Sequence, residues 1–286
     1  MKIFITGGTG LLGKDIVFEL SKNHKLFILI RDDEKKEIFK SFKNINFVKG
    51  SMDKEESFKE KLAECDIVIH AAGTANPKHS MNVNYGLTKK IISLCANNQK
   101  FVYISSFNAT FKNKSNYTVS KQMAEKAVIE SSLDYLIFRP TLLYNKKGEV
   151  YILKLVKQII KLPFALQPGN GMYFLQPLFT EDFAQIISLS LNNINNRIIS
   201  VAGKEAVSIK ELIQLILSRT KTKPVLRIPV LLLRFMGRFV GMNRDKINEL
   251  GENKTMNINA TEKEFNISLR SVREVIPEII KYAKTT

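Results

Sequence analysis

Short apolar runs alternate with segments of helical periodicity along the first half of the chain. The first run, Lys2–Thr6, predicts a strand, and Lys14–Leu20 carries apolar residues at the spacing of one helix face. Further strands are predicted over Leu26–Ile30 and Phe101–Ile104. This alternation continues to about Tyr144 and predicts an α/β fold built on a doubly wound parallel sheet.

The pattern changes after Tyr144. The polar stretch Asn145–Gly148 predicts a crossing into a second domain, Val150–Ile160 predicts a helix there, and the chain is expected to return to the sheet around Asp182–Ala202. At 286 residues and 44% hydrophobic content, the chain can bury a core of this size. The expected boundaries are residues 1–145 plus about 176–202 for the sheet domain, and about 146–175 plus 203–286 for the smaller domain.

A glycine-rich stretch, Thr6-Gly7-Gly8-Thr9-Gly10-Leu11-Leu12-Gly13, lies between the first predicted strand and helix. This is the context that a dinucleotide-binding fingerprint requires. Gly7 allows a tight turn, Gly10 lets a pyrophosphate approach the backbone, and Gly13 lets the helix pack closely on the strand. Amides at the helix start would face the anion. The alternative is an ordinary strand-turn-helix unit.

The second predicted strand ends at Arg31. Dinucleotide-binding folds that prefer the non-phosphorylated cofactor place an acid at this position. A guanidinium instead suits a 2'-phosphate, to which it donates two charge-assisted hydrogen bonds. We therefore expect NADP(H) to be favoured over NAD(H). Because Asp32 and Asp33 follow directly, the alternative is that Arg31 is a solvated strand end.

A tyrosine and a lysine stand four positions apart in Tyr117-Thr118-Val119-Ser120-Lys121, at the start of a helical pattern. On a helix, Tyr117 and Lys121 share one face, and the ammonium would lower the tyrosine pKa towards the range of a general acid or base. The strand Phe101–Ile104 delivers Ser105-Ser106 to its carboxyl end, where a hydroxyl could hold a substrate carbonyl. Alternatively, the tyrosine and lysine are an exposed helix pair and the serines a helix cap.

With these motifs in this order, the chain resembles the short-chain dehydrogenases/reductases of the extended or atypical branch. Further stretches match in sequence order: Asp66–Gly73, Val83-Asn84-Tyr85 with Thr88, Phe138–Tyr144, Gln176–Asp182 and Val201-Ala202-Gly203. The resemblance covers nearly the whole chain. It implies a Rossmann-like domain with a smaller, C-terminal substrate-binding subdomain, and hydride transfer between nicotinamide and a carbinol or ketone carbon, most simply of a nucleotide-linked sugar.

The resemblance also implies roles for single residues. Tyr117 would be the catalytic acid/base, Lys121 its partner on the cofactor ribose, and Ser106 the carbonyl holder. Asn84 would be a supporting polar group, although a helix cap explains it equally well. The expected cofactor contacts are Gly7, Thr9, Gly10, Leu11, Leu12, Gly13, Arg31, Met52, Ala71, Ala72, Gly73, Asn84, Lys121, Pro140 and Leu143.

Some features depart from the nucleotide-sugar enzymes of this superfamily. In Gly50-Ser51-Met52-Asp53 a serine stands where many members have an acid, and only eleven positions separate Ser106 from Tyr117. The pattern from Leu162-Pro163 through Gly169-Asn170-Gly171 is closer to the atypical branch, which includes the accessory NADPH-binding subunit of respiratory complex I. The alternative function is therefore a non-catalytic NADP(H)-binding assembly or regulatory protein.

Composition adds little to the functional assignment. Only two cysteines occur, Cys65 and Cys95, which favours a reduced, cytoplasmic protein, and the three histidines have no metal-ligand spacing. His70 lies inside an apolar run and is expected to be a packed core residue. The net charge of +17 either attracts anionic ligands or reflects many solvent-exposed lysines. Because the sequence contains no recognised nucleic-acid-binding motif, nucleic-acid binding is not expected.

The stretch Arg227–Gly241 combines a strongly apolar side with three arginines. It is too short and too charged to span a bilayer. One interpretation is that it contacts an anionic membrane surface, and the other is a helix that packs the second domain against the first. A homodimer is a further open expectation.

Overall fold

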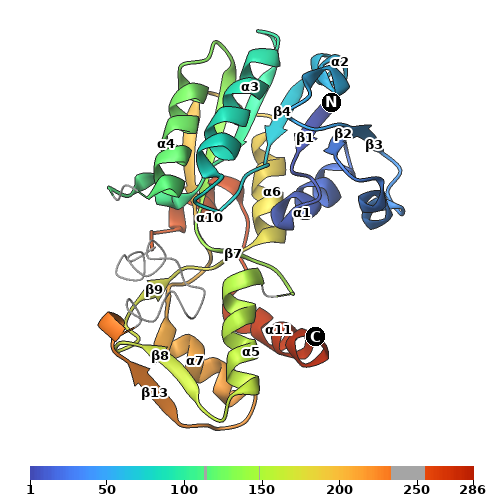
Figure 1. Ribbon diagram of the computed structural model, residues 1–286. Helices are drawn as coiled ribbons and strands as arrows, with labels where there is room; N and C mark the ends of the chain where they lie inside the picture. The colour runs from blue at the N-terminus through green and yellow to red at the C-terminus, as the bar shows by residue number, and fades with distance from the viewer. Residues whose placement is uncertain (113–114, 148, 233–254) are drawn as a thin grey trace. The chain divides into compact units, whose positions relative to one another are not determined.

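The computed structural model describes residues 1–112, 115–147, 149–232 and 255–286 (Figure 1). The chain divides into two compact units. The first comprises Met1–Pro140 and Thr180–Val201, and the second comprises Thr141–Phe179 and Ala202–Thr286. The main chain therefore leaves the first unit after Pro140, returns at Thr180 and leaves again after Val201.

A seven-stranded parallel sheet forms the centre of the first unit. Its order is β11-β6-β5-β4-β1-β2-β3, so the winding reverses between β1 and β4. The strands are β1 (Lys2–Thr6), β2 (Lys25–Ile30), β3 (Ile45–Lys49), β4 (Ile67–His70), β5 (Lys100–Ile104), β6 (Asp134–Pro140) and β11 (Arg197–Val201). This confirms the predicted Rossmann-like fold. In such sheets ligands bind beyond the carboxyl ends of the strands at the point of reversal.

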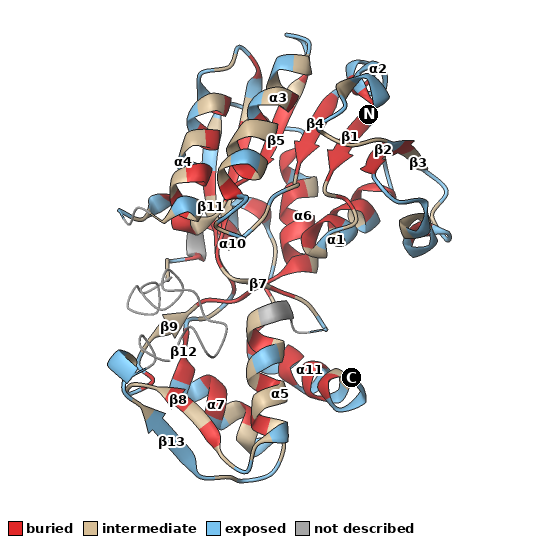
Figure 2. Cartoon of the chain, in the orientation of Figure 1, coloured by how far each residue is buried: buried red, intermediate tan, exposed pale blue. Residues whose placement is uncertain are grey.

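Helices cover both faces of this sheet. They are α1 (Leu11–Leu20), η1 (Asp33–Phe39), η2 (Glu55–Ser57), α2 (Lys59–Ala63), η3 (Met81–Gly86), α3 (Leu87–Leu94), η4 (Phe107–Thr110), α4 (Asn116–Ile129) and α6 (Thr180–Ser190). On one face, Phe101 packs with Ile91 of α3 and Val128 of α4. On the other, the rings of Phe138 and Phe183 of α6 meet edge to face at 5.5 Å. The inner strands β1, β2, β4 and β5 are consequently buried along most of their length (Figure 2).

The second unit has its own hydrophobic core, to which α5, α7 and α11 contribute. Its elements are β7 (Leu143–Tyr144), η5 (Glu149–Leu153), α5 (Lys154–Lys161), β8 (Ala165–Pro168), β9 (Phe174–Leu175), β10 (Leu178–Phe179), β12 (Val207–Ser208), α7 (Ile209–Ser218), β13 (Val225–Ile228), α10 (Asn259–Phe265) and α11 (Val272–Thr285). The strands form three small pairs, β10 with β7, β12 with β9, and β13 with β8. Side chains such as Ile159, Ile213 and Ile276 fill the space between the helices.

The start of the first helix differs from the prediction. It begins at Leu11 rather than Lys14, because Gly10 is extended at the N-cap position (φ −73°, ψ −178°) and the glycine stretch itself enters the helix. The helix predicted over Val150–Ile160 is present, but its first turn is the wider η5.

The stretch Arg227–Gly241 is described only in its first part, and residues 233–241 lie outside the described residues. Arg227 and Ile228 belong to the strand β13, so a single helix over the whole stretch is wrong. Leu231 is 78% exposed. Within the described ranges, none of the helices has the length and hydrophobicity needed to cross a bilayer.

Candidate functional site

The glycine stretch forms a tight turn directly against the end of β4. Gly7 has a φ of +73°, which favours glycine. A Cβ on Gly7 would lie 2.7 Å from the carbonyl carbon of Ala71 and from Cα of Ala72. A Cβ on Gly13 would clash with the Gly7 carbonyl oxygen and lie 2.7 Å from Gly8 Cα. The structure therefore brings the glycine stretch together with the predicted Ala71-Ala72-Gly73 turn, at the reversal point of the sheet.

The N-terminus of α1 is suited to an anion. Its N-cap, Gly10, has no side chain, and the first turn contains no acidic residue. The first amides of a helix have no acceptor within it, and they carry the positive end of the helix dipole. Here those amides belong to Leu11, Leu12 and Gly13, and the buried Leu12 side chain anchors the turn. Thr9 is half-buried in the preceding loop.

Lysines engage both acids that follow Arg31. The Asp32 carboxylate lies 3.6 Å from Lys35, while Asp33 accepts from Lys36 at 2.8 Å and from Lys49 at 2.5 Å. The hydrogen bonds from these two lysines lower the pKa of Asp33 to about 2. The end of β2 therefore presents an exposed guanidinium beside carboxylates that already have cationic partners.

Lys121 has a buried ammonium at the carboxyl end of β5. The residue is 4% exposed, and its Nζ donates to the Ile104 carbonyl at 2.8 Å and to the Tyr103 hydroxyl at 3.2 Å. Burial lowers the pKa of Lys121 to about 8, against the opposing charge of Glu125. A Cβ on Gly73 would lie 3.5 Å from Nζ, so the ammonium is beside the turn that follows β4. The exposed helix pair considered above is wrong for Lys121.

Tyr117 lies one turn before Lys121 on α4 and is half-buried. Its charge would raise the pKa of the buried Tyr103, after the larger effect of burial itself. Tyr117 is thus electrostatically coupled to the phenol that contacts Lys121. Helix α4 begins with a side-chain cap, because Ser115 Oγ accepts from the Thr118 amide at 3.1 Å. This cap fixes the start of the turn that carries Tyr117.

The two serines after β5 have different surroundings. Ser106 is half-buried and caps η4, its Oγ accepting weakly from the Asn108 amide at 3.3 Å. That bond uses the oxygen as an acceptor, so the hydroxyl hydrogen can still be donated to a substrate carbonyl. Ser105 is buried and donates to Glu125. Glu125 also accepts from Arg139 Nε at 3.0 Å and from Nη2 at 2.5 Å.

Asn84 does not cap a helix, in contrast to one of the two interpretations above. It lies inside η3 and is fully buried. Its Oδ1 accepts from the Thr74 amide at 2.8 Å, and its Nδ2 donates to the Thr74 carbonyl at 2.9 Å and to Ser120 Oγ at 3.0 Å. Asn84 therefore ties the turn after β4 to α4, the helix that carries Lys121.

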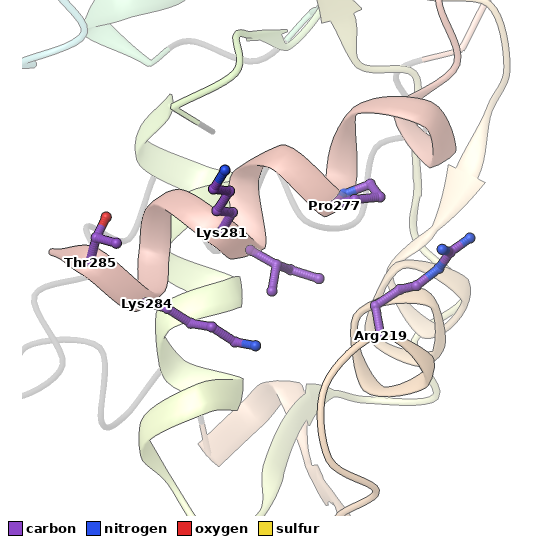
Figure 3. A pocket seen from close by; sticks show the side chains of 6 residues that line it. Arg219, Pro277, Lys281, Lys284 and Thr285 are labelled. Carbon is purple, nitrogen blue, oxygen red and sulfur yellow. The ribbon is translucent and has the colours of Figure 1, made fainter.

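The remaining predicted contacts are more dispersed. Met52 follows β3 and is half-buried against the core of the first unit. Pro140 is the last residue of β6, whereas Leu143 lies on β7 in the second unit, where it pairs with Leu178. A separate hollow of about 460 Å³ in the second unit is lined by Arg219, Pro277, Ile280, Lys281, Lys284 and Thr285 (Figure 3). It contains none of the predicted site residues.

Several residues of this site were not predicted. The buried Glu125 and the partly exposed Arg139 form an ion pair, and Thr88 and Tyr103 lie in the hydrogen-bonded interior beside Lys121. One signal existed in the sequence: Tyr117, Lys121 and Glu125 are each four positions apart, a spacing that places all three on one helix face. His70 is fully buried, as expected of a packed core residue, and burial lowers its pKa to about 3.

The comparisons with known proteins agree with this geometry. A family model described as NAD(P)H-binding matches residues 7–159, more than half of the chain. The chain belongs to this NAD(P)H-binding family. The match starts in the glycine stretch and includes both Tyr117 and Lys121. The resemblance to short-chain dehydrogenases/reductases of the extended or atypical branch is thereby confirmed.

Relatives of this member of the NAD(P)H-binding family include one protein named as a subunit and one named as an assembly factor. It is 25% identical to NADH dehydrogenase [ubiquinone] 1 alpha subcomplex subunit 9, mitochondrial, of Dictyostelium discoideum, over 77% of this chain and 65% of that protein. It is 26% identical to the photosystem II assembly factor Ycf39 of Synechocystis, over 84% of this chain and 74% of that protein. The match thus spans slightly less than two thirds of the subunit 9 sequence.

The fold is shared with solved nucleotide-sugar enzymes. UDP-glucuronic acid 4-epimerase from Bacillus cereus, in complex with UDP-glucuronic acid and NAD, aligns with a TM-score of 0.79. The alignment covers 100% of this chain and 99% of the epimerase, at 16% identity. At this identity the likeness shows the fold.

Proposed function

We propose that this protein is an NAD(P)-dependent oxidoreductase or epimerase of the short-chain type, acting at a carbinol or ketone carbon. The observation that carries this proposal is the position of the Lys121 ammonium. It is buried at the carboxyl end of β5, beside Gly73 and one helical turn from Tyr117. The same edge of the sheet carries the glycine turn and the open N-terminus of α1. A dinucleotide site and a proton-transfer pair on one sheet edge are what this proposed function requires.

The chain's own residues would divide the work as follows. The amides of Leu11, Leu12 and Gly13 bind the pyrophosphate, and Lys121 binds the ribose hydroxyls. Tyr117 exchanges a proton with the substrate oxygen, and the nearby ammonium stabilises its phenolate form. Ser106 orients that oxygen by donating its hydroxyl hydrogen. When bound, the nicotinamide supplies the hydride donor or acceptor.

The surroundings of Arg31 support a preference for NADP(H). The carboxylates of Asp32 and Asp33 form ion pairs with lysines (Lys35, Lys36 and Lys49). The Arg31 guanidinium can therefore bind the 2'-phosphate of NADP(H). A titration of NADPH and NADH binding by nucleotide fluorescence tests this proposal. We expect Arg31→Ala to weaken NADPH binding about tenfold, on the scale of a lost charge-assisted pair, and to leave NADH binding unchanged. Tighter binding of NADH than NADPH by the unaltered protein would contradict it.

A nucleotide-linked sugar is the substrate class that we propose. Support comes from the fold shared with the Bacillus cereus epimerase and from a second unit large enough to bind a nucleotide. The test uses purified protein with NADPH or NAD, a panel of nucleotide sugars, and Tyr117→Phe as the control variant. Turnover that this substitution abolishes, with cofactor affinity retained, supports the enzyme.

A second candidate is a non-catalytic NADP(H)-binding assembly or regulatory protein. The relatives named as a complex I subunit and a photosystem II assembly factor favour it. It predicts tightly retained cofactor without turnover, and a Tyr117→Phe variant that behaves like the unaltered protein. Native mass spectrometry of the purified protein reports any copurifying nucleotide and the number of chains, and so also tests the proposed homodimer.

Contact with an anionic membrane surface through Arg227–Gly241 and a cytoplasmic location are further proposals. The described part of that stretch supports the first, since Leu231 and Leu232 are exposed. Flotation with vesicles that contain an anionic lipid is the test. Absence of binding would reject the membrane contact.

A further inference from the structure

Two threonines and a histidine form a hydrogen-bonded line in the interior of the first unit. Thr6 Oγ1 lies 2.6 Å from His70 Nδ1, and His70 Nε2 lies 3.0 Å from Thr88 Oγ1. The three residues come from β1, β4 and α3, and all three are fully buried. Because none of them is exposed to solvent, each polar atom depends on the partners that the protein provides.

A main-chain carbonyl fixes the direction of these hydrogen bonds. The Thr88 hydroxyl donates its one hydrogen to the Asn84 carbonyl at 2.5 Å. Thr88 Oγ1 can then only accept from His70, so the hydrogen of a neutral imidazole lies on Nε2. Nδ1 is left as an acceptor, and Thr6 donates its own hydroxyl hydrogen to it.

The surroundings of His70 keep the ring neutral. Burial lowers the pKa of His70 to about 3, and the positive charge of Lys121 acts in the same direction. The ring is packed against aromatic side chains, with its centroid 5.9 Å from that of Tyr103 and 6.2 Å from that of Phe101. A neutral imidazole has one donor and one acceptor nitrogen, so the direction of the two bonds is maintained.

The Thr6 side chain connects this line to the segment after β4. With its hydrogen donated to His70, Thr6 Oγ1 can accept, and the Ala72 amide donates weakly to it at 3.4 Å. The Thr6 carbonyl accepts from the Ala71 amide at 3.1 Å. Thr6 is therefore bonded to this segment through both its side chain and its main chain.

Gly7, the residue after Thr6, is in close contact with the same segment. A Cβ on Gly7 would lie 2.5 Å from the Ala72 nitrogen, and the Gly7 carbonyl accepts from the Gly10 amide at 2.9 Å. Gly10 is the N-cap of α1. A shift of Thr6 would therefore be passed through Gly7 to the amides that begin α1.

We propose that His70 is a positioning residue for the dinucleotide site: its Nδ1 accepts the Thr6 hydrogen and so fixes the start of the glycine turn, which places the first amides of α1 for a pyrophosphate. The inference deepens the proposed function and rests on its assignment of the pyrophosphate to these amides. A turn that is fixed before binding has less freedom to lose when the anion binds, which raises the affinity. His70 thereby gains a role in cofactor binding beyond that of a packed core residue.

A matched pair of substitutions separates this role from packing. His70→Asn can place an oxygen near the position of Nδ1 and so keep an acceptor for Thr6, whereas His70→Gln reaches towards the position of Nε2 and leaves the Thr6 hydrogen without its acceptor. Both lose the imidazole ring, so both should lower the midpoint of thermal unfolding. In fluorescence titrations, the dissociation constant of NADPH should rise about tenfold in His70→Gln and stay within about twofold in His70→Asn.

Substitutions at Thr6 test the same bond from its other side. Thr6→Val is nearly isosteric but removes the hydroxyl, and should weaken NADPH binding about tenfold, whereas Thr6→Ser keeps both the hydroxyl and the affinity. Because Thr6→Val and His70→Gln break the same bond, the double variant should bind NADPH no more weakly than either single variant. The Thr6 pair also serves should a change at His70 prevent folding.

The protonation of the His70 ring is measured in the full chain without cofactor. A long-range ¹H–¹⁵N correlation spectrum of the ¹⁵N-labelled protein at pH 7 distinguishes protonated from unprotonated ring nitrogens. The His70 signals are those lost in His70→Gln. We expect an unprotonated Nδ1 and a protonated Nε2.

Three outcomes would overturn the proposal. They are a protonated Nδ1, unchanged NADPH binding in His70→Gln, and equally weakened binding in His70→Asn and His70→Gln, which a loss of packing would explain. With an unaltered protein that binds NADPH, each of them rejects the role of His70 alone. An unaltered protein that binds neither NADPH nor NADH would refute the proposed function, and the role of His70 with it.

Discussion

Glu125→Gln is the substitution whose cost the structure defines best. Glu125 is 3% exposed, accepts three hydrogen bonds from Arg139 at 3.0, 3.2 and 2.5 Å, and accepts a fourth from Ser105. Glutamine keeps the shape but loses the charge and gains two hydrogens. It therefore leaves a guanidinium without its counter-ion under the end of the sheet.

The expected loss follows from this burial. Removing one partner of a buried ion pair costs about 3–5 kcal/mol. Because the Arg139 side chain is 23% exposed, water compensates part of its lost partner, and we expect the lower end, about 3 kcal/mol. Glu130→Gln on the same helix is the matched control. Its partner Lys126 lies 3.6 Å away, and both side chains are more than 60% exposed, so it should cost less than about 0.5 kcal/mol.

Urea unfolding followed by circular dichroism measures both values. The midpoint should fall clearly for Glu125→Gln and stay in place for Glu130→Gln, with an unchanged slope. The double variant Glu125→Leu with Arg139→Met should recover most of the loss, because it removes both charges at once. If Glu125→Gln unfolds at the same urea concentration as Glu130→Gln, the reasoning about this buried pair is wrong.

Three further substitutions have defined outcomes. Gly13→Ala should lower the free energy of unfolding by about 1–3 kcal/mol in thermal unfolding and abolish NADPH binding, because its Cβ would clash with the preceding turn. Gly10→Ala should have a milder effect, because a Cβ there would lie 3.1 Å from its nearest atom. Lys223→Met should cost about 2 kcal/mol, since Lys223 Nζ donates to three carbonyls at the end of α5, with the exposed Lys221→Met as a neutral control. Folding lowers the pKa of His70 from 6.5 to about 3. The free energy of unfolding should therefore be unaffected by His70 above pH 6.5 and should fall by about 1.4 kcal/mol per pH unit between pH 6.5 and pH 3. Acid unfolding of His70→Gln should lack this pH dependence, and equal pH slopes for the two proteins would contradict the prediction.

Local patterns in the sequence were enough to predict the fold and the glycine turn. An apolar run, a glycine stretch and a helical repeat are each contained within a few residues, and their order alone predicts the parallel sheet. The same locality explains why Tyr117 and Lys121 were recognised, since both lie on one turn of α4.

The interior of the site could not be predicted in this way. Thr6 and His70 are 64 positions apart, and Tyr103 and Lys121 are 18 apart, so only the register of the sheet brings them together. Burial of Lys121 was also hidden, because a lysine on a predicted helix reads as solvated. The preference for a core role at His70 was correct because a histidine inside an apolar strand has few alternatives.

The order in which the sheet is assembled has a consequence for synthesis on the ribosome. Strand β6 ends at Pro140, yet its outer neighbour β11 begins only at Arg197, after the first excursion into the second unit. Until that strand emerges, the growing chain presents the backbone of Leu136–Phe138 as an open edge. The sheet of the first unit is therefore completed only after Thr141–Phe179 of the second unit has been synthesised. A chain stalled shortly after residue 140 would expose an apolar strand to chaperones or to its neighbours on the polysome.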